Sequence, residues 1–246
     1  MKKTIQKPKF GLTNNQLKII AMVSMMLDHI GLLFFPDAAI FRVLGRIAFP
    51  IFAYMIAEGC RYTKNRAKYL GMIAGMGILF QVVFLVAMNS LYQGILITFS
   101  LAIITIYAID GLIKSKKLWR RLAALGALAF VAVFVFVLPR LLAGTDFDLD
   151  YGLWGILLPV AVYFLPNRTW RIVGVAALLV VRAIHYTVLP VNSLGLLQWF
   201  SLCTVPLLAL YSGERGRAKM KYVFYIFYPA HLVVLYGLAF LIELLK

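Results

Sequence analysis

The sequence predicts an all-α, polytopic membrane protein, a bundle of about nine transmembrane helices with a cytoplasmic N-terminus. Of its 246 residues, 63% are hydrophobic and 14% are charged, and the mean hydropathy is +0.90. Soluble domains are nearer to half apolar and a quarter charged, so this composition excludes a soluble enzyme or binding module. Apolar runs of about 17–25 residues recur along the chain, and this length crosses a hydrocarbon core about 30 Å thick.

Nine apolar segments predict the spans, and the short sixth one leaves eight to ten spans open. They cover residues 17–35, 40–60, 69–88, 95–113, 120–139, 151–165, 170–189, 194–211 and 222–244. The connections are short and the sequence shows no internal repeat, so residues 1–246 are expected to form a single domain. Since the first run is too long for a signal peptide and no small-residue cleavage site follows it, residues 1–16 are expected to be an uncleaved cytoplasmic segment.

Lysine and arginine predict the orientation. Twenty of the 25 basic residues lie in five segments: 2–18, 61–68, 114–121, 168–171 and 215–221. These segments alternate with the connections 89–94, 140–150 and 190–193, which together carry one basic residue. Because cytoplasmic loops are rich in lysine and arginine, we expect the five segments on the cytoplasmic side of the inner membrane. The net charge of +16 therefore favours contact with anionic lipids over nucleic acid.

Three aspartates precede the sixth span on the expected outer side, Asp146, Asp148 and Asp150. Alternating carboxylates suit a cation. Asp150 also fits as the N-cap of the next helix, and we favour this interpretation. No metal site is expected.

Polar residues collect at one depth of the predicted bundle. A helix rises 1.5 Å per residue, which places His29 and Arg182 roughly 18 Å, Arg46 roughly 20 Å and His231 roughly 14 Å from the cytoplasmic ends of their spans. Asp28, Gln81 and Gln198 fall in the same layer. A charge there costs several kcal/mol unless it faces the protein interior and has a partner.

Two explanations of this layer remain open. Structural ion pairs, such as Asp28 with Arg46 or Arg182, would lock helices together. Alternatively, the layer lines a polar cavity for chemistry or transport. The two histidines favour this second explanation, because imidazole groups suit proton transfer. Asp28 and His29 are adjacent on a helix, so their side chains diverge by about 100° and each needs partners on other spans.

Two prolines lie beside this layer. Pro50 cannot donate to the carbonyl of Arg46, and Pro229 cannot donate to that of Tyr225. In a bilayer, such carbonyls need protein groups or water in a cavity. Tyr228 is three residues before His231 and shares its helix face.

Nearer the cytoplasm, Glu58 is expected to pair with Arg61, three residues further on. The basic segments 61–68 and 114–121 that follow Glu58 and Asp110 suit anionic lipids. They equally suit a polyanion such as coenzyme A, and the sequence leaves both open.

Four stretches match a known family in order along the chain: "LKIIAMVSMMLDHIG" (17–31), "LGRIAFPIFAYMIAEGCRYTKNRAKYL" (44–70), "DYGLWGILLPVAVYF" (150–164) and "FYIFYPAHL" (224–232). With "LYSGERG" (210–216), they resemble the TraX family, which is named for a conjugation-plasmid protein that N-acetylates pilin. This family is related to the integral-membrane acyltransferases. The resemblance implies acyl transfer from cytoplasmic acyl-CoA, with acetyl-CoA as donor, to an amine or hydroxyl in or across the membrane. The acceptor expected is a protein N-terminus, a glycan or a lipid head group.

The resemblance makes His29 of the Asp-His pair the catalytic candidate. We expect His29 to be the general base, Arg46 or Arg182 to stabilise the oxyanion, Asp28 to hold the arginine, and His231 to orient substrate or relay the proton. The expected substrate-binding residues are Arg182, Tyr228, Glu58, Tyr225, Gln81 and Gln198. A proton-coupled transporter or flippase, and a non-catalytic assembly factor, are the alternatives.

Overall fold

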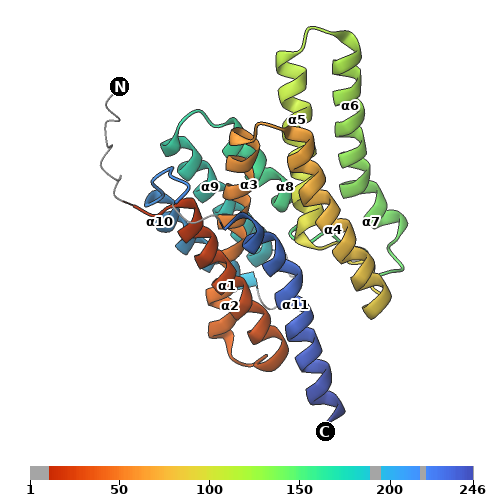
Figure 1. The fold of residues 1–246 in the computed structure, drawn as a ribbon, viewed down its shortest axis with the longest axis vertical. Coiled ribbons are helices and arrows are strands. Elements are labelled where there is room, and N and C mark those ends of the chain that lie inside the picture. Colours follow the sequence, from red (N-terminus) through yellow and green to blue (C-terminus); the bar gives the residue numbers. More distant parts are fainter. Residues whose placement is uncertain (1–10, 189–194, 217–219, 246) are drawn as a thin grey trace. The chain divides into compact units, whose positions relative to one another are not determined.

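The computed structural model describes residues 11–188, 195–216 and 220–245, without the side chains of Lys221, Tyr222 and Tyr225. The expected all-helical membrane fold is confirmed: the described residues form helices and no β-strand (Figure 1). The chain divides into two compact units, residues 1–52 with 179–246 and residues 53–178. We describe each unit by itself. The connection 190–193 and part of the basic segment 215–221 lie outside the described residues.

Seven helical stretches in the described ranges are long and apolar enough to cross a membrane. They are α1 (Asn14–Phe34), α2 with α3 (Ala39–Gly45 and Ala48–Tyr62), α4 (Arg66–Met88), α5 (Ile95–Lys114), α6 with η1 and α7 (Leu118–Ala132, Val133–Val137 and Leu138–Leu141), α9 (Arg168–Val188) and α11 (Lys221–Leu244). Two predicted spans are shorter helices: α8 (Gly152–Phe164), and η2 (Gly195–Cys203) with α10 (Thr204–Ala209). The helix η2 is of the 3₁₀ type.

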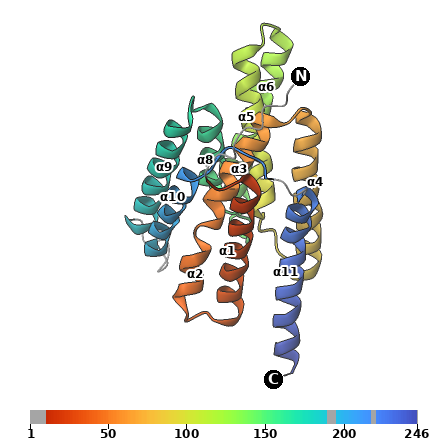
Figure 2. The same ribbon diagram turned by 60° about the vertical axis from the view of Figure 1, so that its left-hand side comes forward.

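In the first unit, α1 and α2 are antiparallel neighbours joined by a short loop (Figure 2). The N-terminus of α1 is closed by a capping box between Thr13 and Gln16. Glycines allow the two helices to approach closely, because a Cβ on Gly31 would lie 2.4 Å from the Phe41 Cβ. A Cβ on Gly45 would lie 2.3 Å from an Asp28 carboxylate oxygen. Small residues commonly permit such close helix contacts in membranes.

The second predicted span is interrupted at Arg46 and Ile47, between the end of α2 and the start of α3. Pro50 lies in the first turn of α3, where its missing N–H leaves the Arg46 carbonyl without a helical donor. Hydroxyl groups bond two carbonyls at this interruption. Ser24 Oγ donates to Leu44 O (2.6 Å) and Thr204 Oγ1 donates to Ile47 O (3.4 Å). The protein itself therefore satisfies backbone groups that lipid could not.

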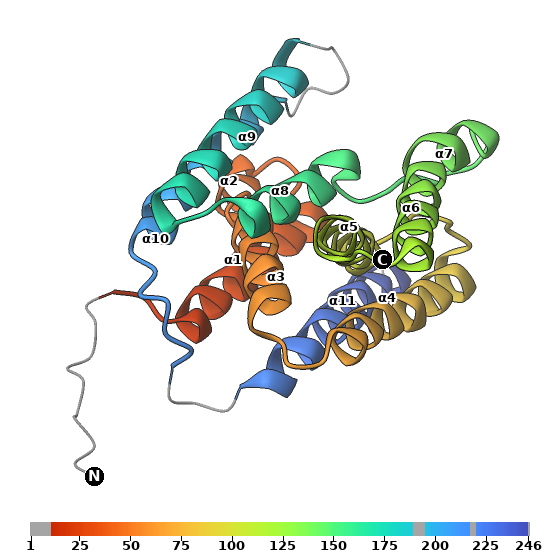
Figure 3. The ribbon, with the colours of Figure 1, turned by 90° about the horizontal axis from the view of Figure 1, so that it is seen from above.

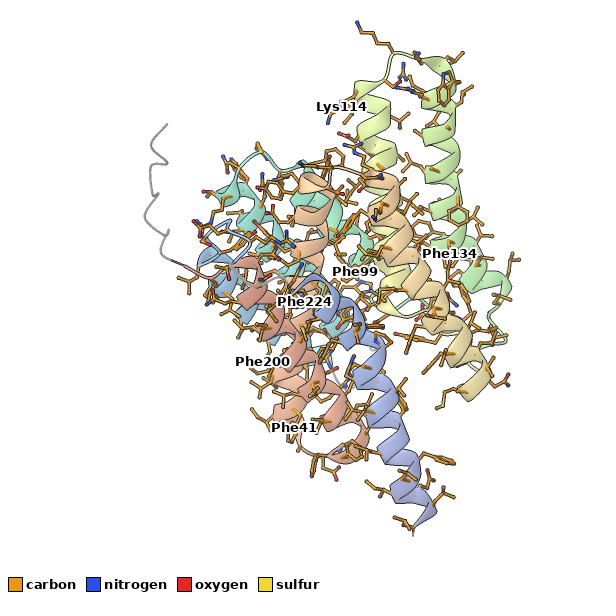
Figure 4. The ribbon with its side chains drawn as sticks, viewed as in Figure 1. Phe41, Phe99, Lys114, Phe134, Phe200 and Phe224 are labelled. Carbon is orange, nitrogen blue, oxygen red and sulfur yellow. The ribbon has the colours of Figure 1, made fainter. Side chains whose placement is uncertain are left out.

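The helix α11 packs against α1 in the same unit. The Lys18 ammonium lies 5.0 Å from the centroid of the Phe224 ring (labelled in Figure 4). Further along both helices, the His29 and His231 rings are in contact. Since residue numbers rise in the same direction at the two contacts, α1 and α11 run parallel.

The second unit is built around α5, which packs against α4, α6 and α8 (Figure 3). A buried cluster joins α5, α6 and α8 with the loop before α8: Leu101, Ala102, Val131, Leu149 and Ile156. Gly155 brings α8 against α5, because a Cβ there would lie 2.5 Å from the Thr98 methyl group. The long helix beginning at Leu118 passes through the π-helical turn η1 just before Pro139, whose ring would clash in a regular helix.

The predicted cap of α8 by Asp150 is wrong. Tyr151, in a left-handed conformation (φ 60°), occupies the N-cap position and makes no side-chain cap bond. The Asp150 carboxylate instead accepts a hydrogen bond from the Tyr92 hydroxyl (3.1 Å), and its carbonyl accepts one from Thr98. These bonds tie the loop before α8 to the loop before α5 and to the first turn of α5.

Candidate functional site

Asp28 on α1 forms ion pairs with Arg42, which lies in α2, and with Arg46, which is the C-cap of α2. Its carboxylate oxygens lie 3.1 Å from Arg42 Nη1 and 3.1 Å from Arg46 Nη2. The three side chains are largely buried: 19% of the Asp28 side chain is exposed, 17% of Arg42 and 9% of Arg46. One carboxylate between two guanidinium groups leaves one positive charge in surplus at this place in the fold.

The local structure explains this arrangement. Arg42 and Arg46 are four residues apart, so they share the face of α2 that packs on α1. Arg46 Nε also donates to the Arg42 carbonyl (3.1 Å), which fixes its direction. Gly45 leaves the space that the Asp28 side chain occupies. The sequence left Arg46 and Arg182 open as the partner, and the structure gives Arg46. The sequence analysis missed Arg42, although its position one turn before Arg46 was a usable signal.

His29 and His231 come together from α1 and α11. Their ring centroids are 5.1 Å apart and their planes meet at 79°, an edge-to-face contact. Phe227 stacks on the His231 ring at 4.7 Å, and Tyr228 meets it edge-on at 5.8 Å. His231 is buried, with 4% of its surface exposed. The fold thus places two predicted catalytic residues and Tyr228 side by side.

Both imidazoles are oriented by their own helices. Nδ1 of His29 lies 2.9 Å from the Met25 carbonyl, and Nδ1 of His231 lies 2.9 Å from the Phe227 carbonyl. A carbonyl oxygen only accepts, so each Nδ1 is the donor and each Nε2 of a neutral ring keeps its lone pair. The buried His231 Nε2 has no hydrogen-bond partner in the described part of the chain. This arrangement presents Nε2 as the basic atom of each ring.

Arg182 and Gln198 are buried in the first unit as well. The Arg182 guanidinium lies over the rings of Phe49 (5.6 Å) and Tyr186 (5.1 Å), a cation–π arrangement. Within the described residues, Gln198 Oε1 is buried without a hydrogen-bond partner. Tyr225 is part of α11, but its side chain lies outside the described residues.

Glu58 and Gln81 belong to the second unit. Glu58 is buried and lies 3.9 Å from Arg61, its predicted partner, and 3.5 Å from Arg171, which the sequence did not indicate. Gln81 Nε2 donates to the Ser90 carbonyl at the end of its helix (3.4 Å). Among the described residues, no group of three or more histidine, cysteine, aspartate or glutamate side chains could hold a metal ion.

Comparison with known proteins decides the family. The sequence model described as "TraX protein" matches residues 13–239. The chain belongs to the TraX family. Protein TraX of Escherichia coli is 29% identical over 91% of this chain and 86% of its own length. The "probable fimbrial assembly protein FimC, serogroup H1" of Dichelobacter nodosus is 24% identical over 89% of this chain and 93% of its own length.

A third relative matches only part of this TraX-family chain. The uncharacterized protein RP591 of Rickettsia prowazekii is 38% identical over 60 residues, or 24% of each chain. No solved structure matches the chain. The model match covers α1 to most of α11, so it includes His29, His231 and the Asp28 ion pairs.

Proposed function

We propose that this protein is a membrane-embedded acetyltransferase that moves an acetyl group from cytoplasmic acetyl-CoA to an amine or hydroxyl acceptor. The contact between His29 and His231 carries the proposal, because each ring is held at Nδ1 and keeps a basic Nε2, and the same unit holds the positively charged ion pairs of Asp28. Ion pairs that only lock helices together would not need two oriented imidazoles.

In this mechanism, His29 Nε2 accepts a proton from the acceptor as its nitrogen or oxygen attacks the thioester carbonyl carbon. A tetrahedral oxyanion forms, then the carbon–sulfur bond breaks and the departing CoA sulfur takes the proton from the His29 imidazolium. The products are the acetylated acceptor and CoA. His231 holds the His29 ring through the edge-to-face contact.

The oxyanion needs positive charge that is already in place. Arg42 and Arg46 supply it, since Asp28 neutralises only one of them and fixes the direction of both. In this proposal, Asp28 is therefore a positioning residue. Arg182, held over two aromatic rings, is the other cation of the first unit that would bind substrate.

The names of the relatives guide the choice of acceptor. One relative is named a probable fimbrial assembly protein, and another is named protein TraX, as is the family. We therefore place the N-terminus of a pilus subunit first among acceptors, before a glycan or a lipid head group. All three are accessible to an enzyme of the inner membrane.

The test is acetyl transfer by the purified protein in nanodiscs, using [¹⁴C-acetyl]CoA and envelope fractions from a strain that lacks the gene. We expect label in a protein, glycan or lipid fraction and release of one CoA per acetyl group transferred. A protein that binds no acetyl-CoA and labels no fraction would refute the proposal. Proton-coupled uptake by the protein in liposomes, without acetyl transfer, would point to a transporter instead.

A further inference from the structure

A second charged group lies in the second unit and shares no residue with the proposed mechanism. Two buried carboxylates, each 4% exposed, hold two cations each. Glu58 pairs with Arg61 and Arg171 at 3.9 and 3.5 Å, and Asp110 pairs with Arg66 and Lys114 at 2.6 Å each. Lys114 marks the end of α5 in Figure 4.

Tyr163, near the end of α8, joins the two carboxylate groups into one. The Arg61 guanidinium lies 5.6 Å from the Tyr163 ring centroid and donates to the Tyr163 carbonyl. Arg66 Nη2 lies 3.4 Å from the Tyr163 hydroxyl. We call the group the Tyr163 cluster, and it consists of Glu58, Arg61, Arg66, Asp110, Lys114, Tyr163 and Arg171.

Packing accounts for half of this cluster. Arg61 also donates to the carbonyl of Val162, and Arg171 donates to those of Leu165 and Pro166. These carbonyls lie at or just beyond the end of α8, where a helix leaves acceptors without partners and favours positive charge. Arg61 and Arg171 therefore close a helix end.

Among the described residues, Arg66 and Lys114 bond the Asp110 carboxylate and no helix-end carbonyl. Arg66 of α4 and Lys114 of α5 both pair with the Asp110 carboxylate, although one cation would neutralise it. The Arg66 side chain is 46% exposed and the Lys114 side chain is 67% exposed. Arg66 also lies over the Tyr107 ring, 4.9 Å from its centroid. Asp110 and Tyr107 thus hold the Arg66 guanidinium in one direction while much of it faces outward. Exposed Lys64 and Lys68 flank it at the start of α4.

We propose that Arg66 and Lys114, oriented by Asp110, bind the phosphate groups of the acyl-CoA donor, in particular its 3′-phosphate. This proposal rests on the proposed function, since it names the place where that donor is held. The cluster carries two positive charges in surplus, which suits a phosphate monoester dianion. Arginine binds phosphate through two parallel hydrogen bonds, and an arginine already held in place loses less entropy on binding. The start of α4 adds the favourable end of a helix dipole.

The experiment compares CoA with 3′-dephospho-CoA by calorimetry on the purified full-length protein in phosphatidylcholine nanodiscs. Wild type should bind CoA more tightly than 3′-dephospho-CoA. Arg66→Gln and, independently, Lys114→Gln should weaken CoA binding by at least about tenfold and 3′-dephospho-CoA binding much less. The matched control is Arg120→Gln, at an exposed arginine of the basic segment 114–121 that lies over the Trp119 ring and forms no ion pair with Asp110.

Equal loss for both ligands, or no loss in either variant, would overturn the proposal. Anionic lipid provides the other source of phosphate. If phosphatidylglycerol stabilises wild type but not Arg66→Gln, while CoA affinity is the same in both, the cluster binds lipid head groups and the proposal is wrong.

The acetyl-transfer assay separates this proposal from the proposed function. Wild-type transfer with an unchanged KM for acetyl-CoA in both variants would reject the phosphate site alone. Selective loss of CoA binding in the variants, with no acetyl transfer by wild type to any fraction, would reject the function and leave the phosphate site supported.

Discussion

His29 and His231 lie 202 residues apart in the chain, and their rings meet edge to face with centroids 5.1 Å apart. Each ring is also held at Nδ1 by the carbonyl one turn earlier in its own helix. This bond satisfies the Nδ1–H group and also fixes the tautomer, which a base requires. The pair is therefore the subject of the first prediction.

Removing the His29 imidazole should abolish turnover. The proposed general base contributes about 10²–10⁴-fold to the rate, so His29→Ala should lose that factor in kcat while acetyl-CoA binding persists. His231→Ala should lose less. Because the rings touch, the double variant should be less impaired than the product of the single effects. His185→Ala, at a histidine exposed near the end of α9, is the control. If the His29→Ala protein folds and turns over at nearly the wild-type rate, the prediction is wrong and the histidine pair is structural.

Removing the Asp28 carboxylate should destabilise the first unit. Asp28→Asn leaves Arg42 and Arg46 beside each other in a largely buried site, and loss of one partner of a buried pair costs on the order of 3–5 kcal/mol. The thermal midpoint in detergent should fall along with activity. Arg42→Gln should be milder, since Arg46 still neutralises the carboxylate. Asp37→Asn, at an exposed loop position, should match wild type. An Asp28→Asn protein as stable and active as wild type would refute this account.

Adding one methyl group at Gly45 should disturb the same ion pairs. The new Cβ would lie 2.3 and 2.4 Å from Asp28 atoms, so the carboxylate must leave its two arginines or the helices must separate. Overpacking typically costs about 1–3 kcal/mol. Gly45→Ala should therefore lower both the thermal midpoint and kcat. Gly71→Ala is the matched control, because nothing lies within 4 Å of the added Cβ there. Equal midpoints for the two variants would show that α1 and α2 tolerate a wider spacing.

The loop pairing between residues 89–94 and 142–151 should weaken in acid. The Ser90 hydroxyl and the Leu91 N–H both donate to the Asp146 carboxylate, at 2.5 and 2.9 Å, and together they lower its pKa below the usual value. A lowered pKa means that this stabilisation is present above the unfolded pKa of about 4 and is lost as the pH falls through the folded value. Amide hydrogen exchange in residues 89–94 should therefore be faster in Asp146→Asn than in wild type at pH 7. The difference should shrink below about pH 4. An equal difference at both pH values would rule out the carboxylate as its cause.

Reporter fusions test the orientation, which remains a prediction from the basic segments. Fusions near residues 65 and 117 should report the cytoplasm, and those near 92 and 145 the opposite side. The corresponding sites near 192 and 217 lie outside the described residues, and we expect the first outside and the second inside. Finding residues 65 and 117 on opposite sides would invalidate the assignment of α4 and α5 as two successive spans.

The sequence alone determined the helical segments and the spacing of polar residues along them, because these features depend on local properties of the chain. Apolar runs of membrane length predict the helices, and Pro50 predicts the break in the second span. Residue spacing along a helix predicts the ion pair between Glu58 and Arg61. Residue counting also predicts similar membrane depths for Asp28, His29, Arg46 and His231. Depth follows from counting residues along an axis, so it needs no knowledge of neighbouring helices.

Only the tertiary structure decided which of these residues meet. Contacts between helices depend on the rotation of each helix about its axis and on which helices are neighbours, and neither is encoded locally. That is why Asp28 forms ion pairs with Arg42 and Arg46. Arg182, predicted at a similar depth, instead lies over the rings of Phe49 and Tyr186. It is also why Arg171 reaches Glu58 from 113 residues away. The contact of His29 with His231 exists because α11 packs parallel to α1, a pairing set by side-chain fit rather than by any sequence pattern.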